Sequence, residues 1–236
     1  MSKYLTPIAV IIAGLAIAGA VLFNGMRSTT VAQQGTQPAA PAVDIKKVKI
    51  DGEPFIGKAD AKVTMALWSD YQCPFCKAVE IGGVPQIPTA PAIPTLIKDY
   101  VDTGKLKIVF KDYPFLGQDS IAGALYERAV WDTYPDKFYI WRDAMYKAQD
   151  EEGDQGFGDE RSITALNRKL GFDADKLSAL VVQNKEKYTK EMTDDRNEGA
   201  AMGVNGTPGF IIGKTLIAGA ESLDKFKTLI DAELKK

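Results

Sequence analysis

The longest apolar run of the chain lies at its N-terminus. No charged residue occurs from Pro7 to Phe23, Lys3 precedes this run, and Arg27 follows it. A helix of that length spans roughly 25 Å, slightly short of a hydrocarbon core of about 30 Å, and the uncharged neighbours nearly close the gap. We therefore expect residues 1–26 to form a single-pass transmembrane anchor. The alternative is a cleaved signal peptide, for which Thr30-Val31-Ala32 offers a weak cleavage site.

Residues 27–42 show no hydrophobic period and are rich in Thr, Gln, Ala and Pro. Such a segment cannot repay its ordering entropy by burial, so we expect a flexible linker. The remaining residues, 43–236, are of ordinary single-domain size. Under either interpretation of the N-terminus, this domain lies outside the cytoplasm.

The domain opens with two strand-like patterns. Val43 to Ile50 roughly alternates apolar and polar residues, which predicts a half-buried strand, and Val63 to Trp68 is a compact apolar run of strand length. The second run ends shortly before Cys73, and Pro74 suits the first turn of a helix, where no backbone donor is needed. The pattern predicts a strand, a short turn and a helix that begins near Cys73.

A proline-rich segment then interrupts the helical pattern. Gly82 to Pro94 contains four prolines, too many for a helix interior, and predicts an irregular loop. Helical character returns from Thr95 to Asp102 and stops at Gly104, and Leu106 to Tyr113 predicts a second core strand.

A long helical block follows, which we interpret as an insert over about residues 116–202. Its aromatic side chains recur at helical spacing and are expected in the core rather than around a cofactor. The predicted helices are Asp119 to Tyr134, Asp136 to Ala148, Ser162 to Leu170, and Lys176 to Met202 with a break.

The C-terminal segment predicts a hairpin and a helix. Gly209 to Ile212 and Thr215 to Ala218 are short strands around a Gly-Lys turn, and Ser222 can cap a helix that runs to about Leu234.

The acidic, glycine-rich loop from Asp150 to Glu160 lacks glycine at the sixth position of a standard calcium loop, so a solvated loop is favoured.

The amino-acid composition excludes several classes of catalytic and binding site. The sequence has no histidine, which excludes imidazole bases and Cys-His or Ser-His pairs, and 29 basic residues nearly balance 31 acidic ones, which does not favour nucleic acid. The only two cysteines, Cys73 and Cys76, cannot supply the four ligands of a closed zinc or iron-sulfur site. We expect no metal and no cofactor.

Two cysteines on the first turn of a helix suit disulfide exchange. The attacking species is the thiolate, and a helix N-terminus favours an anion by roughly 0.3 to 2 kcal/mol. Cys73 would form the mixed disulfide and Cys76 would resolve it. The alternatives are a structural disulfide, which in so short a loop contributes only about 2 kcal/mol, and a metal-trafficking pair.

The motifs together resemble the DsbA-like branch of the thioredoxin superfamily. The resemblance rests on Pro54 to Gly57, Val63 to Cys76, Lys111 to Phe115 and Gly203 to Phe210, and it covers the chain from about Val43 to the C-terminus. It implies an α/β, thioredoxin-like fold with an inserted helical domain.

The resemblance also implies roles for individual residues. Cys73 is then the nucleophile and Cys76 the resolving cysteine, with Pro74 and Phe75 between them in the active-site motif. Pro208 is the cis-proline that faces the pair, and Thr207 turns its backbone toward a substrate chain.

Two positions depart from the pattern of the family. Many oxidising relatives carry histidine where this chain has Phe75, so we expect a less strongly oxidising couple, which a redox titration would check. A carboxylate is often found where this chain has Leu67. Asp70 is close in sequence, but its orientation and the proton acceptor for Cys76 stay open.

The expected function is disulfide formation in cysteine-containing secreted or surface proteins. The expected location is the periplasm or the outer face of the bacterial cell membrane, where a membrane partner would re-oxidise the cysteine pair. The alternatives are a disulfide reductase or isomerase, a chaperone or peptide-binding module that needs no cysteines, and copper delivery by the reduced pair.

Overall fold

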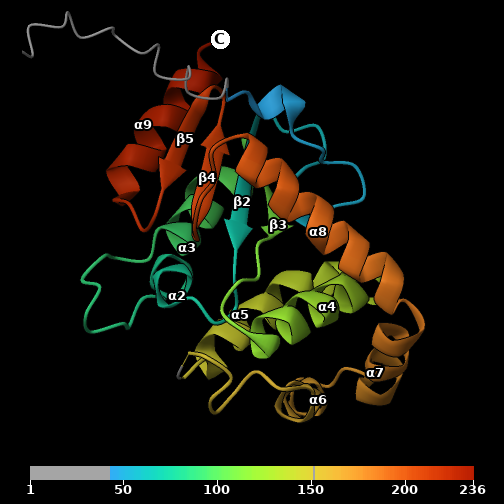
Figure 1. The fold of residues 1–236 in the computed structure, drawn as a ribbon. Helices are drawn as coiled ribbons and strands as arrows, with labels where there is room; N and C mark the ends of the chain where they lie inside the picture. The colour runs from blue at the N-terminus through green and yellow to red at the C-terminus, as the bar shows by residue number, and fades with distance from the viewer. Residues whose placement is uncertain (1–42, 151) are drawn as a thin grey trace, which may run out of the picture. The chain divides into compact units, whose positions relative to one another are not determined.

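The computed structural model describes residues 43–150 and 152–236, so the anchor predicted for residues 1–26 and the linker predicted for 27–42 lie outside the described part. One five-stranded sheet, of order β1-β3-β2-β4-β5, organises this part (Figure 1). Over the described ranges, no helix combines the length and the apolar character that crossing a membrane requires. The strands are β1 (Phe55–Ile56), β2 (Val63–Ser69), β3 (Leu106–Asp112), β4 (Gly209–Ile212) and β5 (Thr215–Ala218).

β2 is the central strand of the sheet, and its side chains contribute to a buried cluster on each face. It pairs in parallel with β3 and antiparallel with β4, so Leu67 lies between Phe110 and Phe210. Because successive side chains of a strand point to opposite faces, Leu67 joins one buried cluster and Trp68 joins the other. Both faces of the strand are therefore covered, as its continuous apolar run predicts.

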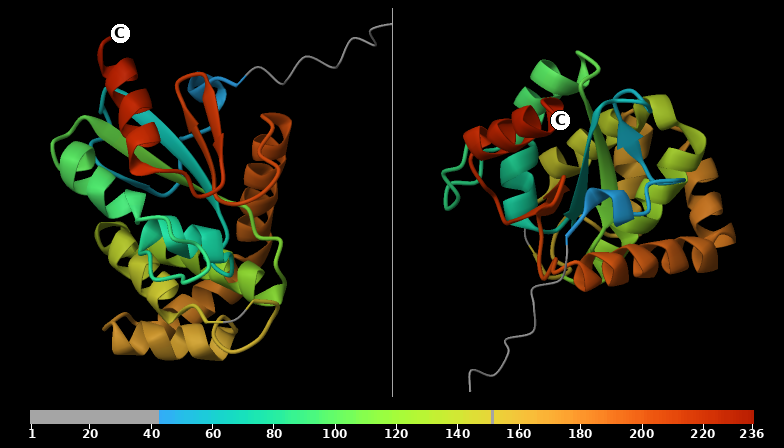
Figure 2. Two further views of the ribbon diagram at one scale, coloured as in Figure 1. Left: turned by 90° about the vertical axis from the view of Figure 1, so that its left-hand side faces the viewer. Right: turned by 90° about the horizontal axis from the view of Figure 1, so that it is seen from above.

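Different helices cover the two faces (Figure 2). The larger cluster packs the sheet against α2 (Pro74–Glu80), α3 (Ala92–Leu96) and α9 (Leu223–Leu234). The smaller cluster packs it against the segment from residue 43 to 50 and against the C-terminal end of α8 (Lys185–Ala201).

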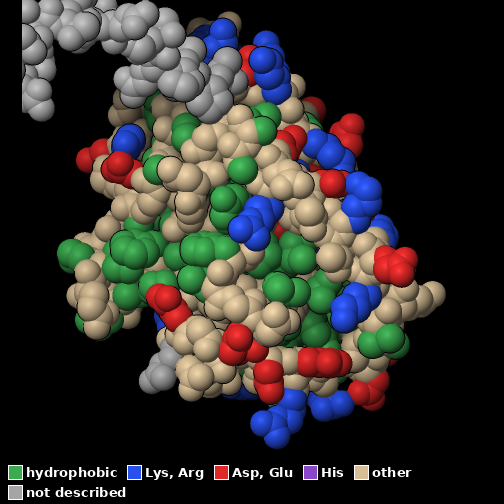
Figure 3. Space-filling view, in the orientation of Figure 1, with side chains coloured by type: hydrophobic (Ala, Val, Ile, Leu, Met, Phe, Trp, Pro, Cys, Tyr) green, Lys and Arg blue, Asp and Glu red, His purple; other side chains and the backbone are tan. Residues whose placement is uncertain are grey.

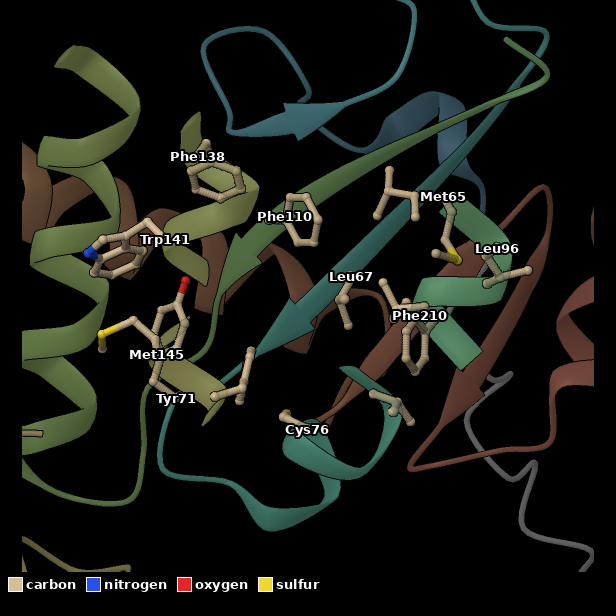
Figure 4. Close-up of a cluster of buried hydrophobic side chains, with 14 of the residues drawn as sticks. Met65, Leu67, Tyr71, Cys76, Leu96, Phe110, Phe138, Trp141, Met145 and Phe210 are labelled. Atoms are coloured by element: carbon tan, nitrogen blue, oxygen red, sulfur yellow. The ribbon is translucent and has the colours of Figure 1, made fainter. Parts of the chain in front are cut away.

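Five helices lie between β3 and β4 in the chain, where the sequence predicts the helical block. The aromatic side chains of this block fill the core beside the sheet, where Phe138 and Trp141 pack near Phe110 (Figure 4). The helices are α4 (Gln118–Thr133), α5 (Phe138–Ala148), α6 (Glu160–Lys169), α7 (Ala174–Gln183) and α8, with a short 3-10 turn η3 (Pro135–Lys137) before α5.

The strand predicted over Val43 to Ile50 is wrong. This segment contains a 3-10 turn, η1 (Ile45–Lys47), which the Asp44 side chain caps by accepting from the backbone N–H of Lys46 at 3.0 Å. Its alternating pattern arises because Val48 packs into the smaller cluster while its lysine neighbours face solvent. A two-residue pattern is too short to recognise, so β1, which pairs with β3, was not predicted.

The loop predicted over Gly82 to Pro94 ends earlier than expected, because α3 begins at Ala92. Pro94 is the third residue of this helix, in the first turn, where its missing N–H leaves no hydrogen bond unmade. A π-helical turn, η2 (Ile97–Val101), continues α3, and Gly104 follows with a φ of 73°. The two core strands, the hairpin and the break in the last insert helix, at Asn184, are confirmed.

Candidate active site

The two cysteines lie at the N-terminus of α2, shortly after the end of β2. Cys73 is the N-cap residue of α2, and Pro74 occupies the first helical position, as the sequence predicts. The Cys73 N–H donates to the carbonyl of Asp70 at 3.1 Å, and the Cys73 carbonyl accepts the first helical bond from Lys77 at 3.1 Å. We call residues 70–76 the redox turn.

The two sulfurs lie one helical turn apart in the same buried cluster, but the pKa of the first is lowered and that of the second is raised. Both are free thiols; Cys73 is 3% exposed and Cys76 is fully buried on the apolar core (Figure 4). A hydrogen bond from the Cys76 thiol lowers the pKa of Cys73 to about 7, against an opposing effect of burial, with smaller contributions from Thr207 and from the backbone N–H groups of Cys76 and Phe75. Burial, and then the neighbouring Cys73 sulfur, raises the pKa of Cys76 well above its ordinary value.

Thr207 and Pro208 lie directly against this pair. The Cys73 thiol donates to the Thr207 carbonyl, with 3.3 Å between sulfur and oxygen, and the Thr207–Pro208 peptide bond is cis. Pro208 immediately precedes β4, whose first residue, Gly209, pairs with Trp68 of β2. The sheet register thus brings together two motifs that lie far apart in the sequence.

The surface around the redox turn is apolar. Phe75 is 48% exposed and Phe115, on the loop between β3 and α4, is 46% exposed. Hydrophobic side chains gather in a band over α2, the loop that follows it and the middle of this face (Figure 3). Exposed large side chains of this kind suit contact with an unfolded or extended polypeptide.

Asp70 points away from the sulfurs. One carboxylate oxygen accepts from the N–H of Gln72 at 2.8 Å, and the other accepts from the N–H groups of Phe115 at 2.9 Å and Leu116 at 3.3 Å. Burial raises the pKa of Asp70, and these hydrogen bonds oppose the rise. Asp70 therefore ties the redox turn to the Phe115 loop. Leu67 lies in the apolar core, and within the described residues no carboxylate hydrogen-bonds either sulfur.

Sequence reasoning missed Arg142, a fully buried cation on α5 beneath the redox turn. Its guanidinium pairs with Glu80 of α2 at 2.7 Å, donates to the Ser69 hydroxyl at 2.8 Å and to the Tyr71 hydroxyl at 3.2 Å. The signal was an arginine inside the aromatic face of α5, between Trp141 and Met145. A charged residue on such a face predicts a buried partner.

The acidic loop that follows α5 is held by backbone N–H groups of the loop itself and of α4. Asp150 accepts from the N–H of Phe157 at 2.8 Å, and Asp154 accepts from the N–H of Asp119 at 2.9 Å. In the part of the chain that the structure describes, no group of three or more His, Cys, Asp or Glu side chains is arranged to hold a metal ion.

Comparisons with known proteins agree with this geometry. The family model described as Thioredoxin matches residues 49–232. The chain is 27% identical over 186 residues to the probable disulfide bond formation protein D of Bacillus anthracis, covering 77% of this chain and 78% of the relative. It is 26% identical over 190 residues to the disulfide bond formation protein D of Bacillus subtilis (strain 168), covering 79% of each.

Solved structures show the same fold. Oxidised BdbD from Bacillus subtilis superposes with a TM-score of 0.71 at 25% identity, covering 84% of this chain and 99% of that one. The thiol-disulfide exchange protein alpha-DsbA2 from Wolbachia pipientis superposes with a TM-score of 0.64 at 27% identity, covering 76% of this chain and 86% of that one.

Proposed function

Because the chain belongs to the thioredoxin family, in its DsbA-like branch, and is a thiol-disulfide oxidoreductase, we propose that it forms disulfide bonds in secreted or surface proteins through Cys73 and Cys76. One observation carries the proposal. The first sulfur, at the N-cap of α2, has a pKa of about 7, while the pKa of the second, fully buried sulfur is raised.

The reaction follows from this asymmetry. In the oxidised protein, a substrate thiolate attacks the Cys73 sulfur, the bond between Cys73 and Cys76 breaks, and Cys76 leaves with the electron pair and takes up a proton. A second substrate thiolate then attacks the substrate sulfur of the mixed disulfide and expels Cys73 as a thiolate. The substrate has lost two electrons and the cysteine pair has gained them.

The low pKa of Cys73 favours this direction. A thiol of lower pKa is the better leaving group, so the mixed disulfide resolves toward the substrate disulfide and the Cys73 thiolate. Thr207 and Pro208 would guide the substrate chain, whose backbone would pair beside Thr207, and Pro74 and Phe75 would contact its side chains.

The location and the recharging partner complete the proposal. The N-terminal apolar segment would keep the domain at the outer face of the membrane, where disulfides persist. A membrane redox partner would re-oxidise the pair by accepting its two electrons.

The test supplies the oxidised full-length protein, in detergent and without oxygen, to a reduced, unfolded protein that contains two cysteines. We expect one substrate disulfide per oxidised molecule, measured by mass after thiol blocking. C73S and the C73S/C76S double variant should transfer none. Failure of the wild type to transfer its disulfide would favour a reductase or isomerase. A chaperone would instead suppress aggregation of the unfolded substrate equally well as the wild type and as the C73S/C76S double variant.

A further inference from the structure

The C-terminal end of α5 reaches the backbone of the redox turn. Gln149, the C-cap residue of α5, is 5% exposed, and its backbone N–H still donates to Met145. Its side-chain amide nitrogen donates to the carbonyl of Tyr71 at 2.6 Å and to the carbonyl of Cys73 at 3.1 Å. A residue of the helical block thus hydrogen-bonds the cysteine that we propose as the attacking residue.

Lys77 of α2 also hydrogen-bonds both Gln149 and Cys73. The ammonium of Lys77 donates to the backbone carbonyl of Gln149 at 2.5 Å. The backbone N–H of Lys77 donates to the backbone carbonyl of Cys73 at 3.1 Å. The Cys73 carbonyl therefore has two donors, one from its own helix and one from Gln149. Lys77 and Gln149 together bind α2, the redox turn and α5 to one another.

We propose that Gln149 is a positioning residue for disulfide exchange, which fixes the carbonyls of Tyr71 and Cys73 and thereby keeps the Cys73 sulfur at the N-terminus of α2. The inference rests on the proposed role of Cys73. Gln149 touches neither sulfur, so its effect is transmitted through the backbone of the redox turn.

The physical argument concerns the reduced state. Without Gln149, the Cys73 carbonyl would keep only the Lys77 N–H as a donor. Each lost donor leaves more of the negative charge of the oxygen uncompensated, and here that charge lies within the residue that carries the thiolate. The amide N–H groups of Gln149 offset it, and they also restrain the turn so that the backbone N–H groups of Phe75 and Cys76 face the sulfur. Loss of the amide should disfavour the thiolate and hence the reduced form.

Two substitutions test this proposal in the full-length protein. Q149M keeps the length of the side chain and removes the donors, and Q149E also places a carboxylate against the two carbonyl oxygens. Q183M, at an exposed position at the end of α7, is the matched control. The readouts are the pH dependence of Cys73 alkylation, the equilibrium constant with glutathione, and the thermal midpoint.

We expect Q149M to raise the pKa of Cys73 by about half a unit to one unit. Measured at a pH of about 9, where the thiolate predominates in both proteins, the equilibrium constant for reduction by glutathione should fall by roughly three- to tenfold. Q149E should shift both quantities further in the same direction, and Q183M should shift neither. If Q149E does not fold, Q149M alone decides.

Variants that melt at a lower temperature but keep the wild-type pKa and equilibrium constant would overturn the proposal, because Gln149 would then be only structural. An equal shift in Q183M would also overturn it. A wild-type Cys73 with an ordinary thiol pKa of about 8.5 would instead contradict the proposed function itself.

Discussion

At the scale of single residues, the site works through the contrast between two chemically identical groups. Cys73, the N-cap residue of α2, accepts hydrogen bonds from the Cys76 thiol and from backbone N–H groups. Cys76 lies one helical turn later in the same buried cluster, and burial has the largest effect on its pKa. The same helix therefore supplies one sulfur that ionises near neutral pH and one that stays protonated. This contrast makes Cys73 the better leaving group in the second step, when a substrate thiolate resolves the mixed disulfide.

The pH dependence of alkylation reports this contrast. We expect iodoacetamide to modify Cys73 of the reduced protein with a rate that rises to a plateau and is half-maximal at a pH of about 7. C76A removes the thiol that contributes most to the low pKa of Cys73 and supplies no other donor, so the midpoint of its profile should move to higher pH. Quenched-flow alkylation followed by mass spectrometry measures both profiles.

Stability gives a second measure of the same group. Because folding lowers the pKa of Cys73, the stabilisation is present above the unfolded value of about 8.5 and is lost as the pH falls through about 7. The reduced protein should gain about 1 kcal/mol of unfolding free energy between pH 6.5 and pH 8.5, because Cys73 contributes about 1.5 kcal/mol and ionisation of Cys76 in the unfolded chain opposes it by about 0.4 kcal/mol. The oxidised protein should lack this gain. Identical pH profiles for both forms would contradict the low pKa.

The sequence allowed the cysteine pair, Thr207 and Pro208 to be singled out, because their spacing and resemblance are local properties. It could not show the orientation of Asp70 or the role of Gln149. Both depend on which loop packs against the redox turn, and that is decided by tertiary contacts with residues 78 positions away for Gln149 and 45 for Asp70.

At the scale of elements, α8 approaches the sheet more closely than most side chains would allow. A Cβ at Gly199 would lie 2.7 Å from the indole nitrogen of Trp68, which is fully buried and donates to the carbonyl of Asp195 at 2.9 Å. Glycine in a helix costs about 1 kcal/mol relative to alanine, so its presence here reflects this close contact.

We expect G199A to destabilise the protein by about 1 to 3 kcal/mol in urea unfolding. Displacing a packed indole and its hydrogen bond costs more than the roughly 1 kcal/mol that alanine gains in helix propensity. N197A, at an exposed position of the same helix, is the control and should change stability by less than about 0.5 kcal/mol. A stabilised G199A would show that α8 can shift away from Trp68 at little cost.

The elements that were predicted well are those whose pattern repeats along the chain. β2, β3, the hairpin and the helices of the insert have long apolar runs or clear helical periods. The segment from Val43 to Ile50 was assigned wrongly because its alternation reflects packing of a loop against the sheet, and periodicity alone cannot distinguish these cases.

At the scale of the whole domain, a buried ion network joins the sheet to the helical block. Arg128 of α4 pairs with Glu53 at 2.6 Å, with Asp112 of β3 at 2.7 Å, and with Asp195 of α8. Lys111 of β3 pairs with Glu53 at 3.2 Å and with Asp195. Burial raises the pKa of Asp112 to about 6 and that of Asp195 to about 7, against the opposing effect of Arg128.

Removing Arg128 should therefore be costly. We expect R128M to lower the free energy of unfolding by about 3 to 5 kcal/mol at pH 8, because three buried carboxylates would be left with the buried Lys111 and the exposed Lys49 as their cations. The deficit should shrink at pH 5, where protonation of Asp112 and Asp195 removes their charge. Urea titrations at both pH values measure the difference.

An exposed arginine supplies the control. Arg168 pairs with Asp175 at 2.7 Å on the surface, so R168M should cost less than about 1 kcal/mol at either pH. If R128M cost no more than R168M, the network would not contribute to joining the two parts of the domain. None of this network was predicted, since its members lie on four separate segments of the sequence.

The outer strands of the sheet are short: β1 has two residues and β5 has four. Unpaired strand edges recruit other extended chains, and brief edges offer them little backbone to pair with. If the protein acts on unfolded substrates, as we propose, these short edges make it poorly suited to seed their aggregation. In the proposed reaction, oxidised substrates would find little edge backbone to pair with at the flanks of the sheet, and would diffuse away to finish folding.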